Sequence, residues 1–259
     1  MSDFFRVCDE IADAVTEISE ELAGTVAGAE VVGLGADGTP TKKIDRVAED
    51  CAIEYLKASQ ICSLVISEEA GKVALDGEHG TVFLDPIDGT FNATRGIPFF
   101  AISIAFAVGG KVTKGYVRDI PHGESFSAEK GKGAFIGEKR IHVSKTSTLH
   151  GCAMSIYGRK FDPNRIFALG GRVRRWRLLG ASALELCYVA AGRIDGFIDI
   201  RETLRVTDAA AGMLICREAG GIVTDANGEE LTFPEEVSIG RTIVATNGYL
   251  HGKVIEYIR

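Results

Sequence analysis

The sequence lacks paired cysteines, an excess of positive charge and long apolar runs. Its six cysteines are scattered without any C-x-x-C spacing, so neither a disulfide framework nor a thiolate zinc site is expected. Lys and Arg total 29 against 36 Asp and Glu, a net charge of −7, which argues against a general nucleic-acid or anionic-membrane binder. No apolar run reaches the roughly 18 residues of a membrane helix. The N-terminus is too acidic for a targeting peptide, so we expect a soluble, cytoplasmic protein.

Proline is also scarce, with 6 residues, whereas glycine is frequent, with 31. Many tight turns and few rigid linkers are therefore expected. Hydrophobic residues make up 46% of the chain and charged residues 25%, a composition that excludes wholesale disorder. A chain of 259 residues can bury a large core without disulfides or structural metals. We expect the cysteines to be buried thiols in a reducing compartment.

Apolar spacing in the first half of the chain indicates two helices and then an antiparallel meander. Phe4, Val7 and Ile11 begin a pattern of threes and fours that predicts a helix over residues 4–22. A second helix is predicted over residues 45–58, after a glycine-rich turn. The predicted strands cover residues 63–67, 80–84, 99–108, 112–120, 124–129 and 131–136.

The second half alternates short strands and helices instead. Predicted strands cover residues 152–156, 197–200, 221–224 and 242–245, and predicted helices cover 182–191, 208–218 and the C-terminus. This order indicates a layered α+β fold with two sheets. We divide the chain into residues 1–148, which carry the acidic motifs, and residues 149–259, which carry substrate-selecting residues, within one compact unit.

Three groups of acidic residues lie where strands end or helices begin. Glu68 and Glu69 follow the apolar strand LVIS, residues 85–90 (DPIDGT) follow TVFL, and Asp208 begins a helix. Side chains at such positions point into the crevice where sheet proteins bind ligands. Converging carboxylates repel one another unless cations lie between them, and hard oxygen ligands suit Mg²⁺. Backbone N–H groups after Asp88 offer a seat for phosphate, so metal-assisted phosphoryl transfer to water is indicated.

Each acidic group alone has an ordinary structural explanation as a solvated pair, a helix cap or a turn. The hexapeptide at residues 85–90 differs, because the pattern D-P-[ILV]-D-G-[ST] has a chance frequency on the order of 10⁻⁷ per position at equal residue usage. That rarity favours the functional interpretation over the structural one.

At these residues the sequence resembles the inositol monophosphatase superfamily of Mg²⁺-dependent, typically lithium-sensitive phosphatases. One family signature corresponds to LDPIDGTFN at residues 84–92, and a second to TDAAAG at residues 207–212, followed by EAGG at residues 218–221. The upstream acidic element matches residues 67–69, and Asp45 matches a further acidic position. The resemblance covers essentially the whole chain and is greatest to archaeal members with both fructose-1,6-bisphosphatase and inositol-1-monophosphatase activity.

The resemblance implies a layered αβαβα sandwich and a set of metal ligands, although Thr207 stands where the family commonly has Trp. The implied ligands are Glu68, Asp85, the carbonyl of Ile87, Asp88 and Asp208. Two or three Mg²⁺ ions would bind there, with Mn²⁺ as a possible substitute, and Asp85 would bridge two of them.

The remaining roles near the metals also follow from the resemblance. Glu68 and Thr90 would hold the attacking water, while Glu69 and Asp45 would support the outer shell or a third ion. The backbone of Gly89 and Thr90 would bind the phosphate, together with Asp88 at the same loop.

Substrate selection is expected from a basic segment at residues 159–177 and from residues near it. The segment contains Arg159, Lys160, Arg165, Arg172, Arg174, Arg175 and Arg177 against one acid, Asp162. It is either a solvated surface or a site for a second phosphate or a sugar, since Arg suits bidentate oxyanion recognition. The resemblance favours Arg177, Arg201 and Ser182 as substrate-binding residues. Asp199 is a candidate hydroxyl acceptor, and Tyr157 a weaker candidate for the distal phosphate.

The predicted function is hydrolysis of fructose-1,6-bisphosphate and inositol-1-phosphate by a metal-activated water, a role in carbohydrate metabolism such as gluconeogenesis. The partners expected are small sugar or inositol phosphates, with no nucleic acid and no membrane, and the resemblance implies a homodimer or tetramer. Two alternatives stay open: a 3′-phosphoadenosine 5′-phosphate phosphatase, for which no adenine pocket is evident, and a catalytically inactive binding or regulatory homologue.

Overall fold

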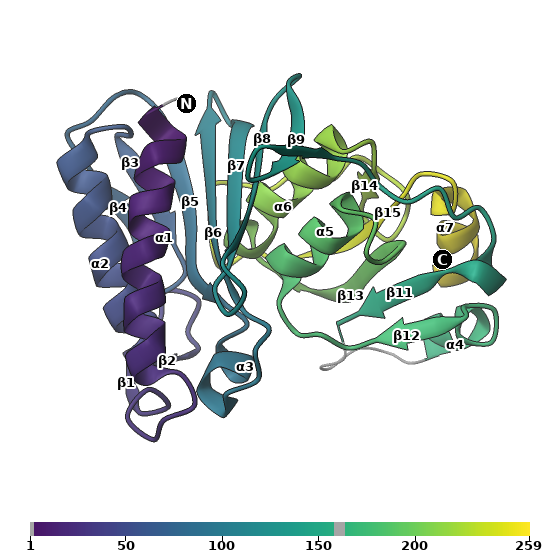
Figure 1. Ribbon diagram of the computed structural model, residues 1–259, viewed down its shortest axis with the longest axis horizontal. Coiled ribbons are helices and arrows are strands. Elements are labelled where there is room, and N and C mark those ends of the chain that lie inside the picture. The colour runs from purple at the N-terminus through teal and green to yellow at the C-terminus, as the bar shows by residue number, and fades with distance from the viewer. Residues whose placement is uncertain (1–2, 158–163) are drawn as a thin grey trace.

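The chain folds into five alternating layers of helices and sheets, as the computed structural model shows for residues 3–157 and 164–259 (Figure 1). A pair of helices covers one face of an eight-stranded sheet, and a second pair fills the space between that sheet and a five-stranded one. Two further helices cover the outer face of the five-stranded sheet. The α+β sandwich expected from the sequence is therefore observed, with its layers in the order αβαβα.

The first outer layer and the large sheet come from the N-terminal part of the chain. Along the chain, a hairpin of β1 (Val31–Leu34) and β2 (Pro40–Lys42) connects helix α1 (Asp3–Leu22) to helix α2 (Lys43–Ser59). The large sheet has the order β10-β9-β8-β7-β6-β5-β3-β4. Its strands are β3 (Leu64–Ser67), β4 (Gly71–Ala74), β5 (Thr81–Asp88), β6 (Ala101–Val108), β7 (Lys111–Asp119), β8 (Glu124–Glu129), β9 (Gly133–Ile136) and β10 (Lys139–Ile141). The short helix α3 (Thr90–Arg95) follows β5 directly.

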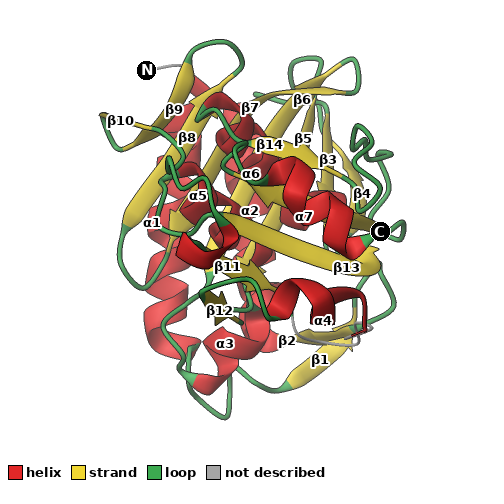
Figure 2. Ribbon diagram, turned by 90° about the vertical axis from the view of Figure 1, so that its right-hand side faces the viewer, coloured by secondary structure: helices red, strands yellow, loops and turns green. Residues whose placement is uncertain are grey.

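The central helices and the small sheet come from the C-terminal part. The central layer is α5 (Ser182–Ala190) and α6 (Val206–Glu218), and the sheet order is β12-β11-β13-β15-β14. Its strands are β11 (Ala153–Ile156), β12 (Arg175–Arg177), β13 (Gly196–Leu204), β14 (Ile222–Thr224) and β15 (Arg241–Thr246), preceded by the 3₁₀ turn η1 (Leu149–Gly151). The outermost helices, α4 (Asn164–Gly170) and α7 (His251–Ile258), lie in front of this sheet in Figure 2.

Small residues make the crowded central layer possible. Helix α6 is buried along nearly its whole length, so it lacks the polar face of α1. A Cβ on Gly212 would lie 2.7 Å from the Cβ of Leu186, and one on Gly115 would lie 2.8 Å from the carbonyl oxygen of Ala211. The alanine- and glycine-rich sequence of residues 208–212 therefore lets α6 approach both α5 and the large sheet. This close packing fixes the start of α6, where Asp208 lies.

Most predicted elements are present, and the elements that were not predicted are short edge strands, the 3₁₀ turn η1 and the seven-residue helix α4. The sequence patterns did not indicate the β1–β2 hairpin or the strands β4, β10 and β12, which are three or four residues long. Such segments carry too few residues for an alternation to stand out. All six cysteines are free thiols, and only Cys51 is not fully buried. Among the described residues, no helix is both long and apolar enough to cross a bilayer.

The expected division into residues 1–148 and 149–259 stays a prediction. The large sheet ends at residue 141 and the small sheet begins at residue 153. However, α5 and α6 of the second half share one apolar core with the large sheet of the first. The end of the large sheet that carries the predicted ligands and the start of α6 are consequently held by the same packing.

Candidate active site

A break in the pairing of β5 aims two carboxylates at one place. The register with β6 passes from Asp85 opposite Ser103 to Asp88 opposite Ala101, so β5 carries one extra residue. Pro86 lies in this bulge, where the lack of an N–H removes no ladder bond. The backbone N–H of Ile87 instead donates to Asp85 Oδ1 at 3.1 Å. Without the bulge, strict alternation would keep Asp85 and Asp88 on opposite faces of the strand.

Glycine is required at the next position. Gly89 has φ of 95°, in the left-handed region, and a Cβ there would lie 3.0 Å from the Cβ of Ala181 and 3.2 Å from that of Phe100. The chain turns at this point from β5 into α3. The turn brings Thr90 back over the strand end, and its hydroxyl lies 3.1 Å from the carbonyl oxygen of Ile87 and 3.0 Å from Asp45 Oδ1.

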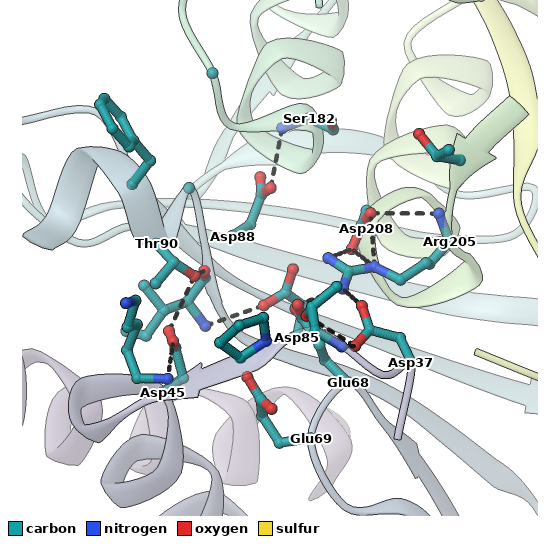
Figure 3. A pocket seen from close by; sticks show the side chains of 18 of the residues that line it. Asp37, Asp45, Glu68, Glu69, Asp85, Asp88, Thr90, Ser182, Arg205 and Asp208 are labelled. Carbon is teal, nitrogen blue, oxygen red and sulfur yellow. Dashed lines mark hydrogen bonds and ion pairs between the residues drawn. The ribbon is translucent and has the colours of Figure 1, made fainter. Parts of the chain in front are cut away.

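Asp88 lies at the start of helix α5, across the interface between the two halves. Its oxygens accept hydrogen bonds from the backbone N–H groups of Ser182 at 3.0 Å, Ala183 at 2.7 Å and Leu184 at 3.4 Å. These are N–H groups that the first turn of a helix leaves without partners. Asp88 therefore caps α5, in the orientation that Figure 3 shows.

Three carboxylates from three elements converge beside Asp88. Glu68 follows β3, Asp85 lies on β5 and Asp208 lies in the first turn of α6, and each offers an oxygen within 4.8 Å of the others (Figure 3). Glu69, the neighbour of Glu68, is held differently, by a short hydrogen bond from the Thr41 hydroxyl. The predicted ligands Glu68, Asp85 and Asp208 are thus brought together, with Asp88 next to them.

Burial and crowding disturb the protonation of these carboxyl groups. Burial, with a contribution from Asp208, raises the pKa of Asp88 to about 7. Burial raises the pKa of Glu68 to about 8 although Arg205 opposes the shift, and it raises the pKa of Asp85 well above its usual range. Burial also raises the pKa of Asp45 to about 7. Carboxylates in such a cluster keep their charge at neutral pH only when positive charge is close to them.

Arg205 supplies one such charge, and sequence reasoning missed it. Its Nη2 lies 3.0 Å from Asp208 Oδ1, its Nη1 lies 2.8 Å from Asp37 Oδ2, and Nη1 also forms a short ion pair with Glu68. The signal was present as Arg three residues before Asp in RVTDAAAG, the spacing of a side chain that shares a helix start with the acid. Asp37, on the β1–β2 hairpin, was likewise not predicted.

These side chains line a cavity of about 510 Å³ between the two halves. On the side of the small sheet, the cavity is lined by Tyr157, Ser182, Arg201 and Thr203. The Arg201 guanidinium stacks on the Tyr157 ring at 3.5 Å from its centroid and pairs with Asp199 through two bonds of 2.8 and 2.5 Å. A bulge in β13, with Glu202 at φ of 62°, precedes Arg205 and carries this part of the strand into the cavity.

The basic segment contributes less to the cavity than the sequence suggested. Arg177 is exposed on β12, donates from Nη1 to the carbonyl oxygen of Trp176 at 2.9 Å, and is not among the residues that line the cavity. Arg159, Lys160 and Asp162 lie outside the described residues, as does the side chain of Arg165. Asp199 is fully buried behind Arg201, so its carboxylate meets the guanidinium and not the open cavity.

Residues 4–259 match the sequence model of the inositol monophosphatase family. The chain belongs to this family. A fructose-1,6-bisphosphatase/inositol-1-monophosphatase of Methanothermobacter thermautotrophicus is 40% identical, over 96% of this chain and 94% of that protein. A bifunctional NADP phosphatase/NAD kinase of Methanococcus maripaludis is 37% identical over 98% of this chain, which spans 49% of that protein's length. The IMPase of Thermotoga maritima has the same fold, with a TM-score of 0.81 and 29% identity over 98% of this chain and 95% of that one.

Membership of the inositol monophosphatase family confirms the resemblance drawn from residues 84–92 and 207–212. It also confirms the layered α+β fold and the class of enzyme, a phosphatase of this family. The family acts on small phosphorylated substrates, in agreement with the expected kind of partner. The roles of the individual site residues, the identity of the ion and the substrate stay predictions.

The residues present fit the divalent cations that the family implies. The donors are carboxylate oxygens and one backbone carbonyl, with no sulfur or imidazole among them, and oxygen donors of this kind suit Mg²⁺ and Mn²⁺. Burial and, after it, repulsion among the carboxylates raise the pKa of Glu68, Asp85 and Asp88, although Arg205 lowers the pKa of the first two. A cation-binding centre is therefore chemically consistent with this cavity.

Proposed function

We propose that this protein is a Mg²⁺-dependent phosphomonoesterase that hydrolyses fructose-1,6-bisphosphate and inositol-1-phosphate. The observation that carries the proposal is the convergence of Glu68, Asp85 and Asp208 within 4.8 Å in one cavity. Nothing in the packing requires three carboxylates at one point, two of them buried and Glu68 half-buried, since uncompensated charges there reduce stability. The names of relatives such as the Methanothermobacter protein support the choice of substrates.

In this proposal the ligands are Glu68, Asp85, the carbonyl of Ile87, Asp88 and Asp208, for two or three Mg²⁺ ions or for Mn²⁺ as a substitute. Bound ions of this kind lower the pKa of a water and neutralise charge on the transferring phosphoryl oxygens. Asp85, which is buried beside Glu68 and Asp208, would help to hold more than one of them. Glu69 and Asp45 would support the outer shell or a third ion.

The remaining groups position the water and the substrate. The Thr90 hydroxyl donates to Asp45 or to the carbonyl of Ile87, so its lone pairs would be available to hold the attacking water together with Glu68. The backbone at Gly89 and Thr90 would bind the phosphate at the start of α3. Across the cavity, Ser182, Arg201 and Tyr157 would contact the leaving alcohol or its second phosphate. Arg177 keeps a substrate role only if a bound substrate extends beyond the cavity.

The test is phosphate release from fructose-1,6-bisphosphate and inositol-1-phosphate after removal of metal with EDTA, and again after addition of Mg²⁺. We expect release only in the presence of the metal. Absence of release from any phosphate ester with Mg²⁺ or Mn²⁺ would contradict the proposal and favour the catalytically inactive binding homologue. Sedimentation of the same sample tests the expected homodimer or tetramer, and cell fractionation tests the expected cytoplasmic location.

A second candidate substrate class is nucleotide phosphates, favoured by one specific observation. Phe91, the second residue of α3, lines the cavity and yet is 67% exposed, with the Arg95 guanidinium 5.6 Å from its ring centroid. An exposed ring beside a phosphate site is a surface on which a base can stack. The Methanococcus relative named as an NADP phosphatase agrees with this class. The exposed Phe91 ring also supports the 3′-phosphoadenosine 5′-phosphate alternative, for which the sequence had shown no adenine-binding residue.

A further inference from the structure

Arg205 occupies an unusual position for a cation in a site built of metal-binding groups. It is the last residue before α6, and its backbone N–H and its side chain both bind Asp208, the residue three positions later. The guanidinium engages both oxygens of that carboxylate, with Nε 3.2 Å from each. Its Nη1 forms a second ion pair with Glu68. Arg205 therefore uses oxygens of two of the three carboxylates that form the candidate metal centre.

The same guanidinium also holds the β1–β2 hairpin against the centre. Nη1 lies 2.8 Å from Oδ2 of Asp37, at the tip between the two strands. The other oxygen of Asp37 accepts bonds from the backbone N–H and hydroxyl of Thr39, each at 2.8 Å. One nitrogen thus connects Asp37 and Glu68, which lie 31 positions apart in the chain, a relationship visible in Figure 3.

The hairpin has little apolar packing to hold it in place. Val31, Val32 and Leu34 on β1 are 55%, 46% and 71% exposed, so these side chains contribute little burial. The polar contacts of the tip are correspondingly important. Besides the Asp37 ion pair, they are the N–H of Ala36 to the carbonyl of Glu69 at 3.0 Å and the Thr41 hydroxyl to the Glu69 side chain.

We propose that Arg205 is a positioning residue that competes with the divalent cation for Glu68 and Asp208 and thereby couples metal loading to the β1–β2 hairpin. This inference rests on the proposed metal-dependent function. A guanidinium that engages both oxygens of a carboxylate places its charge beside the position of a bound cation, and the two positive charges repel each other. Arg205 and the metal therefore compete for these oxygens, and when Arg205 gives them up, Asp37 and the hairpin tip loosen with it.

The first measurement is metal affinity, with Mn²⁺ as the probe and its free electron paramagnetic resonance signal as the readout. Arg205→Met removes the charge and keeps an unbranched side chain. We expect it to tighten Mn²⁺ binding by about 10-fold or more, since each 10-fold corresponds to about 1.4 kcal/mol of removed competition. Lys42→Met is the matched control: it removes one positive charge from the same cavity, and among the described residues Lys42 forms no ion pair with Glu68 or Asp208. Equal tightening in both variants would reduce the effect to general electrostatics and overturn the proposal, as would unchanged or weaker binding in Arg205→Met.

The second measurement is hydrogen exchange of the hairpin amides, residues 31–42, with and without Mn²⁺. In the unmodified protein we expect the exchange rates of these hairpin amides to change when Mn²⁺ is added. Asp37→Asn keeps Arg205 but weakens its ion pair to the hairpin, so it should reduce this response while Mn²⁺ affinity stays closer to the original value. This variant changes a half-buried side chain of the hairpin that lies outside the apolar cores, so it also serves if Arg205→Met does not fold. A metal response of the hairpin that is unaffected by Asp37→Asn would overturn the coupling.

The outcome of the titration separates this inference from the proposed function. If the unmodified protein binds no Mn²⁺, the metal-dependent function itself fails. If it binds Mn²⁺ and hydrolyses phosphate esters, but Arg205→Met behaves like Lys42→Met, only the role of Arg205 fails.

Discussion

The backbone N–H of Ala183 donates to Asp88 Oδ2 at 2.7 Å, so a predicted metal ligand from the large sheet also caps a helix of the central layer. Both partners are buried. The position of the carboxylate is therefore set by α5 as well as by β5. This relationship makes the candidate metal centre a junction between the two halves of the chain and bears on what a substitution of Asp88 would do.

Asp88→Asn is expected to lower the rate of phosphate release by on the order of 10²-fold or more, because the contribution of one metal ion to such a reaction is several kcal/mol. The fold should survive. The amide keeps one acceptor for α5, and it relieves repulsion from Asp208, so two opposing effects of ~1 kcal/mol should leave Tm within about 4 °C. Steady-state assays at saturating Mg²⁺ and thermal melts measure the two effects. Exposed Asp50→Asn is the control, and near-normal turnover of the Asp88 variant would refute the ligand assignment.

Substitutions of Arg201 and of Arg177 are expected to differ in their effect on substrate selection. Arg201→Lys keeps a charge beside buried Asp199 but loses the bidentate fork. We expect it to lower kcat/KM for fructose-1,6-bisphosphate roughly 10- to 150-fold, the equivalent of one charge-assisted contact, with a smaller loss for inositol-1-phosphate, which has no second phosphate. Arg177→Ala, outside the cavity, should change neither value by more than about twofold.

Comparing kcat/KM for the two substrates in each arginine variant shows whether that arginine selects the substrate. Equal losses on both substrates in the Arg201 variant, together with a lower Tm, would show that Arg201 only balances the charge of Asp199. Arg201→Ala is less informative, because it leaves a fully buried carboxylate without its partner.

Phe91→Ala tests the nucleotide alternative without touching the metal ligands. If a base stacks on the exposed ring, kcat/KM for NADP or 3′-phosphoadenosine 5′-phosphate should fall about 5- to 150-fold, the usual range for one base–aromatic contact of 1–3 kcal/mol. Inositol-1-phosphate, which has no base, provides the control substrate in the same variant. Phe167→Ala offers a control position, since that ring is 78% exposed on α4 and does not line the cavity. Unchanged selectivity between nucleotide and inositol substrates would remove the observation that favours nucleotides.

Glu185, on α5 and fully buried, predicts a pH dependence of stability. Burial raises its pKa to about 8, against about 4.3 in an unfolded chain, so the folded protein holds a proton that the unfolded chain releases. The stability that Glu185 contributes is therefore fully present below about pH 4 and decreases as the pH rises toward 8. Glu185→Gln cannot ionise and keeps an oxygen for the Ser155 hydroxyl. Its Tm relative to the unmodified protein should rise between pH 5 and pH 9.

Melts in EDTA across that pH range measure the difference, with exposed Glu17→Gln as the control that should show no trend. Parallel Tm curves for Glu185→Gln and the unmodified protein would mean that the carboxyl titrates near its ordinary value. The subtraction between variants removes the contribution of the metal-site carboxyls, which titrate in both proteins.

Local patterns in the sequence were sufficient for the main elements and for the acidic residues that converge in the cavity. Helix α1 buries Phe4, Val7 and Ile11 on one side, as their spacing requires. Residues 85–90 combine a buried strand, a bulge with Pro86 and a turn that only glycine can make, all within six positions. Because these constraints act between residues close together in the chain, they can be recognised in one short segment of sequence.

Contacts between distant segments were decided only by the tertiary structure. Asp37 and Arg205 are 168 positions apart, and no sequence motif links the two residues. An ion pair nevertheless joins them beside Glu68. Arg177 and Arg201 looked equivalent in the sequence, but β12 is an edge strand that leaves Arg177 exposed, whereas β13 is central and its bulge turns Arg201 into the cavity. The physical reason is that a side chain's charge is local, while its partner and its exposure depend on how the two sheets pack around α5 and α6.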